Sequence, residues 1–250
     1  MQINNKTHIV ITGGASGIGL EILKELIKKE AKVSVLDINE PIINLAKRSD
    51  TQILTLKCDI TNYQCVNESL DSIFKIHGPV DILINSAGIM TNCPIYNITN
   101  KINRRHSREL WEKTLNINLY GVFNVSSFVI ENMVENRKKG LIINLSSISA
   151  NGNIGQSAYS AAKAGVESLT KVWAKELSPL GIRSTCIAPG FCSTESTYNC
   201  LDDKKIKQWV NKTPLRRLGE MKEIISTIKY IIENDYFNGK IIELDGGLSI

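Results

Sequence analysis

Short apolar runs alternate with longer amphipathic stretches along almost the whole chain of 250 residues. The runs are rich in Ile, Val and Leu and too short for helices, which is typical of strands buried on both faces. The expected strands cover 8–12, 32–37, 52–58, 80–84, 141–145, 182–188 and 240–244. The stretches between them repeat apolar residues at helical spacing, most clearly at about 18–29, 61–76, 109–136, 156–175 and 221–233.

This alternation predicts an α/β fold, a doubly wound parallel sheet of seven strands with helices on both faces. Polar or glycine residues follow most of the strands. The carboxyl ends of parallel strands meet at one edge, where such sheets bind ligands. No repeat, linker or low-complexity tract interrupts the chain, so residues 1–250 are expected to form a single domain.

A glycine-rich turn follows the first strand. Gly13, Gly17 and Gly19 stand between that strand and the next helix, with Ser16 and Ile18 among them. Glycines let the backbone approach a pyrophosphate, and a helix N-terminus stabilises its negative charge. The turn therefore predicts a dinucleotide-binding (Rossmann) fold, although its spacing differs from the commoner G-x-G-x-x-G.

An acid ends the second strand. Asp37 lies 24 residues beyond Gly13, close to the ~20 that separate such a turn from the acid on the adenosine ribose. A carboxylate there repels a 2′-phosphate, and neither Ile38 nor Asn39 supplies a cation to receive one. The sequence thus favours NAD(H) over NADP(H). The alternative is that Asp37 only caps a helix beginning near Pro41.

A tyrosine and a lysine stand one helical turn apart in the stretch 156–175. This spacing puts Tyr159 and Lys163 on one face of the helix. A nearby ammonium favours the phenolate, so we expect the pKa of Tyr159 to fall below its free value of about 10. Such a pair can transfer a proton near neutral pH. Tyr-x-x-x-Lys also arises by chance in many helices, so the pair gains weight from the nucleotide-binding features before it.

Composition narrows the classes of function. A total of 30 Lys and Arg against 25 Asp and Glu gives a net charge of +5, spread along the chain, which argues against nucleic-acid binding. No apolar run reaches the ~18 residues that span a membrane. The six cysteines form no C-x-x-C pair, and the three histidines lie far apart. A cytoplasmic protein without a metal site is therefore expected, with Cys58 and Cys186 as buried thiols.

Several short motifs, in a fixed order, resemble those of the short-chain dehydrogenase/reductase family. They are TGGASGIG at 12–19, Asp37, Asp59, NSAG at 85–88, NINLYG at 116–121, Ser146 with Ser147, YSAAK at 159–163, PG at 189–190 with Thr194, and DGG at 245–247. The resemblance covers nearly the whole chain. It is specific for the family but not for the substrate, because one fold serves many substrates.

The resemblance implies a role for each matching residue. Tyr159 would exchange a proton with a carbonyl oxygen, and Lys163 would tune Tyr159 and hold the nicotinamide ribose. Asn118 would anchor a water that relays protons, or would only fill a kink in the long helix. The other implied cofactor contacts are Asp59 and Ile60 at the adenine, Asn85, Ala87 and Gly88 on the adenosine side, and further Pro189, Gly190 and Thr194, the last at the carboxamide.

A serine would hydrogen-bond the substrate oxygen, and two serines compete for that role. Counting back from Tyr159 by the family's usual distance lands on Ser146, whereas counting along the strand from Gly140 lands on Ser147. The two counts differ because one residue of the usual family spacing is missing between Gly140 and Tyr159. A residue missing from the strand would turn the strand's side chains to the opposite face, whereas a residue missing from the loop 151–155 costs little free energy. We therefore expect Ser147 beside the reacting atoms and Ser146 on the other side of the strand.

Two further segments bear on the substrate. An extra segment carries Lys101, Arg104, Arg105, His106 and Arg108, and is either a solvated loop or a contact for an acidic partner or a charged substrate tail. The loop and helix at 191–215 hold mixed apolar side chains that suit a modest, partly apolar alcohol or ketone.

Together these features predict an oxidoreductase that interconverts a secondary alcohol and a ketone, a small-molecule substrate, with NAD(H) favoured. The LRRLG run at 215–219 and the DGG ending favour, as an alternative, a 3-oxoacyl-carrier-protein reductase using NADPH. A non-catalytic NAD(H)-binding sensor or scaffold is the alternative of another class. The family resemblance implies a homotetramer, and the small residues Ala158, Ala161, Ala162 and Gly165 would permit close helix packing between subunits.

Overall fold

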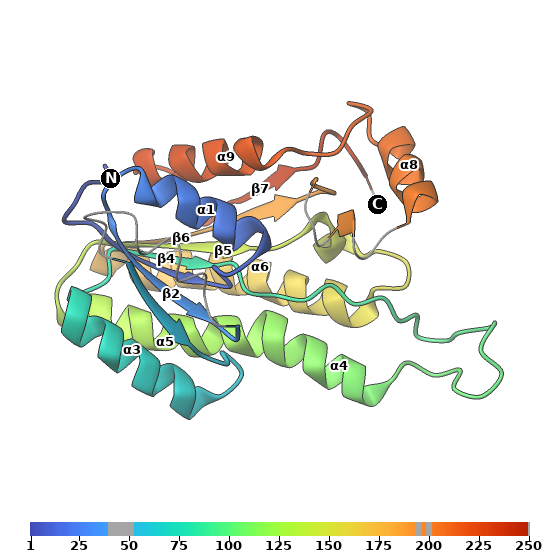
Figure 1. Cartoon of the computed structure of the whole chain (residues 1–250), viewed down its shortest axis with the longest axis horizontal. Coiled ribbons are helices and arrows are strands. Elements are labelled where there is room, and N and C mark those ends of the chain that lie inside the picture. The colour runs from blue at the N-terminus through green and yellow to red at the C-terminus, as the bar shows by residue number, and fades with distance from the viewer. Residues whose placement is uncertain (40–52, 194–196, 199–201, 250) are drawn as a thin grey trace.

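Seven strands form one sheet in the computed structural model, which describes residues 1–39, 53–193, 197–198 and 202–249 (Figure 1). The strands are β1 (His8–Thr12), β2 (Lys32–Asp37), β3 (Ile53–Lys57), β4 (Ile82–Asn85), β5 (Gly140–Leu145), β6 (Ile182–Pro189) and β7 (Ile241–Leu244). Their order is β3-β2-β1-β4-β5-β6-β7, and all six pairings are parallel. The predicted doubly wound sheet is confirmed.

Helices cover both faces of this sheet (Figure 1). They are α1 (Gly17–Ile27), α3 (Tyr63–His77), α4 (Arg108–Leu115), α5 (Gly121–Glu135), α6 (Ser157–Leu177), α8 (Asp203–Lys212) and α9 (Met221–Glu233). α1 and α9 pack on one face, and α3, α5 and α6 pack on the other. Within the described ranges, no helix has the length and apolar character needed to cross a membrane.

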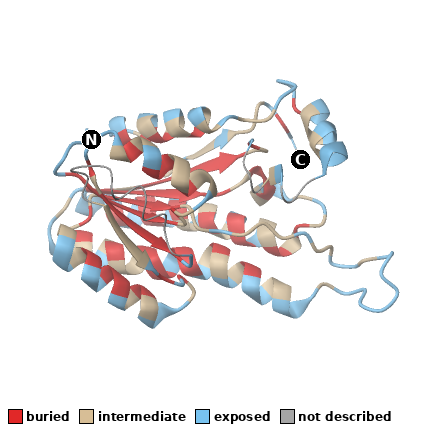
Figure 2. Ribbon diagram, viewed as in Figure 1, coloured by how far each residue is buried: buried red, intermediate tan, exposed pale blue. Residues whose placement is uncertain are grey.

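Strands β1, β2, β4, β5 and β6 are buried on both faces, as their continuous apolar runs predict, whereas the edge strands β3 and β7 are partly exposed (Figure 2). In β1, Ile9 and Ile11 face the layer of α1 and α9, whereas Val10 between them faces the layer of α3 and α5. This alternation fixes the register of the sheet, because a shift by one residue would exchange the two faces. Thr12 consequently stands beside Asn85 at the carboxyl edge.

The long helix expected at 109–136 is interrupted in the middle. Asn116–Tyr120 form a π-helical turn between α4 and α5. At its centre, the Asn118 side chain donates to the carbonyls of Thr114 and Ile89, at 3.0 Å each, and accepts from the N–H of Ile89 at 3.2 Å. The turn adds one residue to the helical repeat, but α4 before it has only one buried residue, Thr114, so no apolar stripe marks the change of phase. The pattern of hydrophobic residues could therefore not reveal it.

The extra segment before α4 folds as a hairpin that projects from the body of the molecule (Figure 1). Tyr96 and Arg105 pair in antiparallel fashion, and Arg104 Nη1 donates to the Tyr96 hydroxyl at 3.1 Å. Ile98 and Ile102 near the tip are 81% and 89% exposed. The hairpin thus exposes both basic and apolar side chains at its surface.

The small-residue face expected on α6 is partly used inside the chain. Ala158 and Ala162 are buried. A Cβ on Gly165 would lie 3.0 Å from Leu119 Cδ1, so the glycine lets the π turn pack closely against α6. Ala158, Ala162 and Gly165 therefore pack within the chain, whereas Ala161 is exposed.

Candidate active site

A cleft of about 860 Å³ runs along the carboxyl edge of the sheet. It includes the ends of β1 and β4, where the order of strands reverses, as expected for ligand sites in such sheets. Most predicted site residues line it: Gly13, Ser16, Gly17, Ile18, Asp37, Asp59, Ile60, Ala87, Gly88, Asn118, Ser147, Tyr159, Lys163, Pro189 and Gly190. Gly19 and Asn85 are not among the lining residues, and Thr194 lies outside the described residues.

The glycine turn brings three backbone segments close together. Gly13 has a φ of +71°, and a Cβ on it would lie 2.7 Å from Ala87 Cα. A Cβ on Gly19 would lie 2.2 Å from the carbonyl oxygen of Gly13, so Gly19 packs α1 against the turn. Ser16 begins α1 without a side-chain cap, which leaves the first N–H groups of the helix available to a phosphate.

Thr12 fixes the other wall of this turn, a contact that the sequence analysis missed. Its Oγ1 accepts hydrogen bonds from the N–H groups of Ser86 and Ala87, at 3.1 Å each. The loop after β4 is therefore tied to the end of β1. A polar residue at the carboxyl end of the first strand is the signal that could have pointed to it.

Asp37 is buried at the end of β2 and held in one orientation. Its Oδ2 accepts from the N–H of Ala15 and its Oδ1 from the N–H of Asn39, both at 2.9 Å. Of the described residues that line the cleft, the cationic ones are Lys113 and Lys163, and neither belongs to the β2 turn. The helix near Pro41 on which the capping alternative depends lies outside the described residues.

Asn85 has a structural position rather than a place in the cleft wall. Its Nδ2 donates to Ser126 Oγ at 2.9 Å and to Asn144 Oδ1 at 2.8 Å, and Asn144 in turn donates to Thr170 Oγ1 at 2.9 Å. This buried ladder joins β4 and β5 to the helices that cover them. The Asn85 amide nitrogen therefore bonds within the core, and Asn85 does not line the cleft.

Tyr159 and Lys163 lie on one face of α6, with Lys163 Nζ 5.8 Å from the centre of the Tyr159 ring. The ammonium donates to the carbonyl oxygen of Leu145 at 2.7 Å. Burial lowers the pKa of Lys163 to about 8. Burial also raises the pKa of Tyr159, and the hydrogen bond with Ser147 opposes that rise. The expectation that the pKa of Tyr159 falls below its free value is therefore wrong, because burial disfavours the phenolate and the Ser147 contact offsets only part of that effect.

The two serines after β5 bond in different directions. Ser146 Oγ donates to Glu167 Oε1 at 2.9 Å and lies 3.3 Å from the carbonyl oxygen of Lys163. Ser147 lines the cleft with Tyr159 and opposes the rise in the Tyr159 pKa, and its Oγ accepts from the N–H of Ser149 at 3.2 Å. Ser147 is therefore the serine beside Tyr159, in agreement with the argument that the deletion falls in the loop.

The substrate end of the cleft is lined by Phe191 and Cys192. The Phe191 ring stacks on Trp209 of α8, with ring centres 4.4 Å apart and planes inclined by 27°. Met90 and Glu112, which flank the projecting hairpin on either side, also line the cleft and were not foreseen. Neither residue directly follows a strand, so the expectation that residues at the carboxyl ends of parallel strands line the site does not include them.

Metal chemistry receives no support from this site. Across the part of the chain that the structure describes, no group of three or more His, Cys, Asp or Glu residues could hold a metal ion. The donor set instead fits a dinucleotide, with free helix N–H groups for phosphates and a buried carboxylate for ribose hydroxyls.

Comparison with known proteins agrees with this geometry. Residues 7–205 match the short chain dehydrogenase family. The chain belongs to that family and is an oxidoreductase acting on CH–OH groups with a nicotinamide dinucleotide. The alternative of a non-catalytic sensor is accordingly set aside.

Individual relatives are similar over almost the full length. The chain is 37% identical over 251 residues to a 3-oxoacyl-(acyl-carrier-protein) reductase FabG of Buchnera aphidicola subsp. Baizongia pistaciae, covering 97% of each. It is 35% identical over 247 residues to the 3-hydroxyacyl-CoA dehydrogenase type-2 of Homo sapiens, covering 96% of this chain and 94% of the relative. A 4-hydroxyisoleucine dehydrogenase complexed with NADH superposes with a TM-score of 0.87 at 28% identity, covering 96% of this chain and 98% of that one.

Proposed function

We propose that this protein uses NAD(H) to interconvert a secondary alcohol and a ketone. The observation that carries the proposal is the meeting of Tyr159, Ser147 and Lys163 in one cleft with the buried carboxylate of Asp37. A proton donor, a hydrogen-bond donor and a ribose-binding acid are the groups that hydride transfer to a carbonyl requires of a protein.

Each side chain has a distinct task in this proposal. The bound nicotinamide supplies or accepts the hydride. Tyr159 gives its proton to the carbonyl oxygen during reduction, and its raised pKa keeps the phenol protonated before that step. Ser147 donates a hydrogen bond to the same oxygen as negative charge develops there. Lys163 holds the nicotinamide ribose and, when charged, favours loss of the Tyr159 proton.

Asn118 is fully buried at the centre of the π turn. Its side-chain groups are engaged by Thr114 and Ile89, so we assign it to holding the loop after β4 against the π turn.

The choice of NAD(H) rests on charge. Asp37 is a fixed carboxylate, and a 2′-phosphate beside it would suffer repulsion in a partly buried setting. The cations Lys113 and Lys163, which line the described cleft, stand on α4 and α6 rather than beside Asp37.

The second candidate is reduction of a 3-oxoacyl thioester with NADPH. It is supported by the relatives that bear acyl-reductase and hydroxyacyl-dehydrogenase names at 37% and 35% identity. The basic hairpin at the cleft also suits a substrate with a charged tail, because Lys101, Arg104 and Arg105 are exposed there.

A substrate panel separates these candidates. Ketones, secondary alcohols and 3-oxoacyl thioesters are offered with NADH and with NADPH, and cofactor absorbance is followed. Turnover of a small ketone with NADH supports the first proposal. Turnover confined to thioesters with NADPH would replace it with the second.

We further propose that the chain acts as a single domain and assembles as a homotetramer. Large apolar side chains stay exposed on the outer surface of the π turn, α5 and α6, namely Tyr120, Phe123 and Val172 at 57%, 48% and 42%. Such a patch is typical of a protein interface. Light scattering on the purified protein measures the assembly directly.

A further inference from the structure

Cys58 and Cys65 lie next to each other at the nucleotide end of the cleft. Both are free thiols, and their Sγ atoms are 3.7 Å apart. A disulfide bond joins sulfurs at about 2.05 Å, so the two atoms would have to approach by about 1.7 Å. A change of side-chain rotamer together with a small backbone shift can supply that movement.

The pair brackets the turn that forms the floor of this end of the cleft. Cys58 follows β3, and its N–H donates to the carbonyl of Asp37 at 2.8 Å. Cys65 belongs to the first turn of α3, where its N–H donates to the capping Asn62 Oδ1 at 3.0 Å. Asp59 and Ile60 stand between the two cysteines and line the cleft, as does Cys58 itself. A covalent bond between the sulfurs would therefore constrain cleft-lining residues directly.

The two thiols differ in access to solvent. Cys58 is 2% exposed, whereas Cys65 is partly exposed. Burial also raises the pKa of Cys58 to about 12. An oxidant in solution consequently meets Cys65 first, and Cys58 is placed to react with whatever forms on Cys65.

We propose that Cys58 and Cys65 are a redox modification site, at which a disulfide oxidant such as oxidised glutathione closes a reversible disulfide bond that weakens dinucleotide binding. The Cys65 sulfur attacks one sulfur of the oxidant and releases one thiol, leaving a mixed disulfide. The Cys58 sulfur then attacks the Cys65 sulfur and releases the second thiol. The cysteines lose two electrons and two protons, and the oxidant is reduced to two thiols.

The disulfide bond would weaken cofactor binding because it disturbs hydrogen bonds that hold the turn between Cys58 and Cys65. Asp59 Oδ1 now accepts from both the N–H and the hydroxyl of Thr61, at 2.9 and 2.8 Å, and the carbonyl of Ile60 accepts from Asn124 at 3.0 Å. Drawing Cys65 toward Cys58 shifts the segment that carries these bonds. The predicted loss of dinucleotide affinity rests on the proposed function, whereas formation of the disulfide bond does not.

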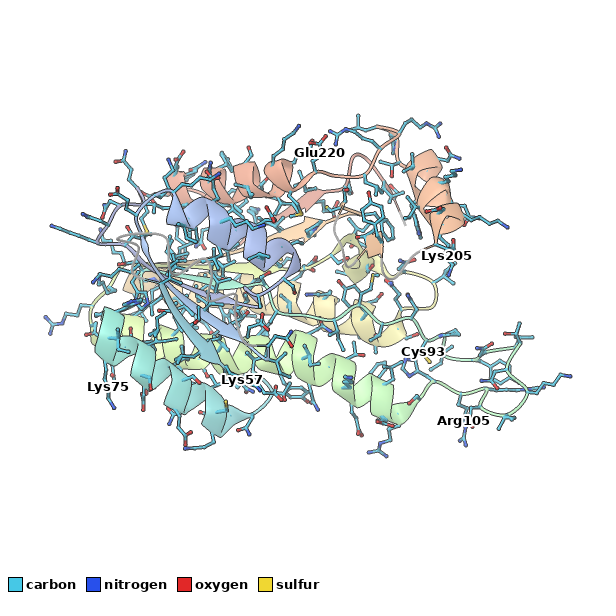
Figure 3. All side chains as sticks on the ribbon, viewed as in Figure 1. Lys57, Lys75, Cys93, Arg105, Lys205 and Glu220 are labelled. Carbon is cyan, nitrogen blue, oxygen red and sulfur yellow. The ribbon has the colours of Figure 1, made fainter. Side chains whose placement is uncertain are left out.

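The test for the bond uses a single peptide. Trypsin cleaves after Lys57 and Lys75, which Figure 3 labels at the two ends of this region, and no Lys or Arg lies between them. Both cysteines therefore fall in one peptide, 58–75. After treatment with oxidised glutathione and alkylation of free thiols, this peptide should carry no label and weigh two hydrogens less. Dithiothreitol should restore two labelled cysteines.

Two variants make the result specific. Cys65→Ser should abolish the loss of two hydrogens, and Cys93→Ser, which removes a partly exposed thiol from another segment, should leave it intact. Peptide 58–75 recovered with both thiols alkylated, or with glutathione still attached to Cys65, would overturn the proposed bond.

The second readout is NADH affinity by fluorescence. Oxidation should raise the Kd of the native protein by about fivefold or more and leave that of Cys65→Ser unchanged. A bond that forms without changing the Kd overturns the regulatory half of the proposal. If the reduced protein binds no dinucleotide, the proposed function is contradicted. The disulfide detected in peptide 58–75 does not depend on that outcome.

Discussion

Ser146 and Ser147 are neighbours in sequence, yet their hydroxyl groups serve opposite sides of the carboxyl end of β5. Ser146 Oγ donates to Glu167 Oε1 at 2.9 Å, whereas the Ser147 hydroxyl interacts with Tyr159 and opposes the rise in its pKa. Successive residues of an extended chain point to opposite sides, so only one of the two can reach the oxygen of a substrate held by Tyr159.

The first prediction separates these serines. Ser147→Ala should lower kcat by about a hundredfold or more, the scale of losing one donor to a developing oxyanion. Ser146→Ala should lower it far less. Steady-state kinetics of the two variants, side by side on a confirmed substrate, check the ranking. The reverse ranking would show that the deletion shifted the strand and not the loop.

The second prediction concerns the proton donor. Tyr159→Phe should reduce kcat by about a thousandfold, because general acid catalysis is lost, and should leave NADH binding nearly intact. Lys163→Ala should impair both, since Lys163 is proposed to serve the proton and the ribose. Turnover and fluorescence titration measure the two effects separately. More than a few per cent of activity retained by Tyr159→Phe would contradict the assignment.

The third prediction tests the cofactor choice. The native protein should bind NADH more tightly than NADPH, and Asp37→Ala should narrow the difference by about tenfold because the repelling carboxylate is gone. Asp37→Asn offers a matched variant that keeps the shape of the side chain. Fluorescence titration with both cofactors gives two dissociation constants for each of the three proteins, and equal affinities in the native protein would refute the preference.

The fourth prediction arises from a buried histidine at the opposite edge of the sheet. His8 Nδ1 donates to the carbonyl of Gly78, and Nε2 hydrogen-bonds with Ser34, both at 2.9 Å. Ser34 also hydrogen-bonds His77 at 2.9 Å. The other charged groups around this cluster are Asp81, Lys32 and Lys138, the last paired with Asp81. Burial, together with His77, lowers the pKa of His8 to about 4.

The sign of the effect on stability follows from that shift. The unfolded chain takes up a proton near pH 6.5, whereas the folded protein resists it until about pH 4, so stability falls across this window as the pH is lowered. The loss should be on the order of 3 kcal/mol, with His77 acting in the same direction. His8→Gln should flatten this dependence in urea unfolding, and His106→Gln should leave it unchanged. A native protein whose stability stays level from pH 7 to pH 4 would contradict the argument.

The fifth prediction concerns the projecting hairpin. Replacing Lys101, Arg104 and Arg105 with Gln should leave the turnover of a small uncharged substrate unchanged, because their exposed side chains stand outside the cleft lining. On a thioester with a phosphate-bearing tail, the same variant should show a higher KM if the second candidate function holds. A collapse of activity on the uncharged substrate would place the hairpin in the site itself.

The sheet and most residues of the cleft could be predicted from the sequence, because both follow from the regular spacing of apolar residues and from the positions at which strands end. Buried strands such as His8–Thr12 show as apolar runs, and residues after parallel strands, such as Gly13 and Asp37, must gather at one edge. The order of the two serines also followed, since alternation along a strand is a local property.

Other features depend on three-dimensional context. The direction of the Tyr159 pKa shift is set by burial, which the spacing of Tyr159 and Lys163 cannot show. The family resemblance implied Asn85 at the cofactor, whereas its Nδ2 donates to Asn144 Oδ1, a partner distant in sequence. The proximity of Cys58 and Cys65 likewise needed the turn between β3 and α3 to be known.

Because of the π turn at Asn116–Tyr120, α4 and α5 are rotated about the helix axis relative to each other, compared with one continuous α-helix. Each residue of an α-helix turns the chain by about 100°, so one extra residue lets α4 direct its side chains to the cleft while α5 directs others to the core. Deleting a single residue there would restore a regular helix and turn one half relative to the other. Either Glu112 would leave the cleft, or Val125 would leave the sheet. The chain length of this turn is therefore constrained independently of the identity of any residue within it.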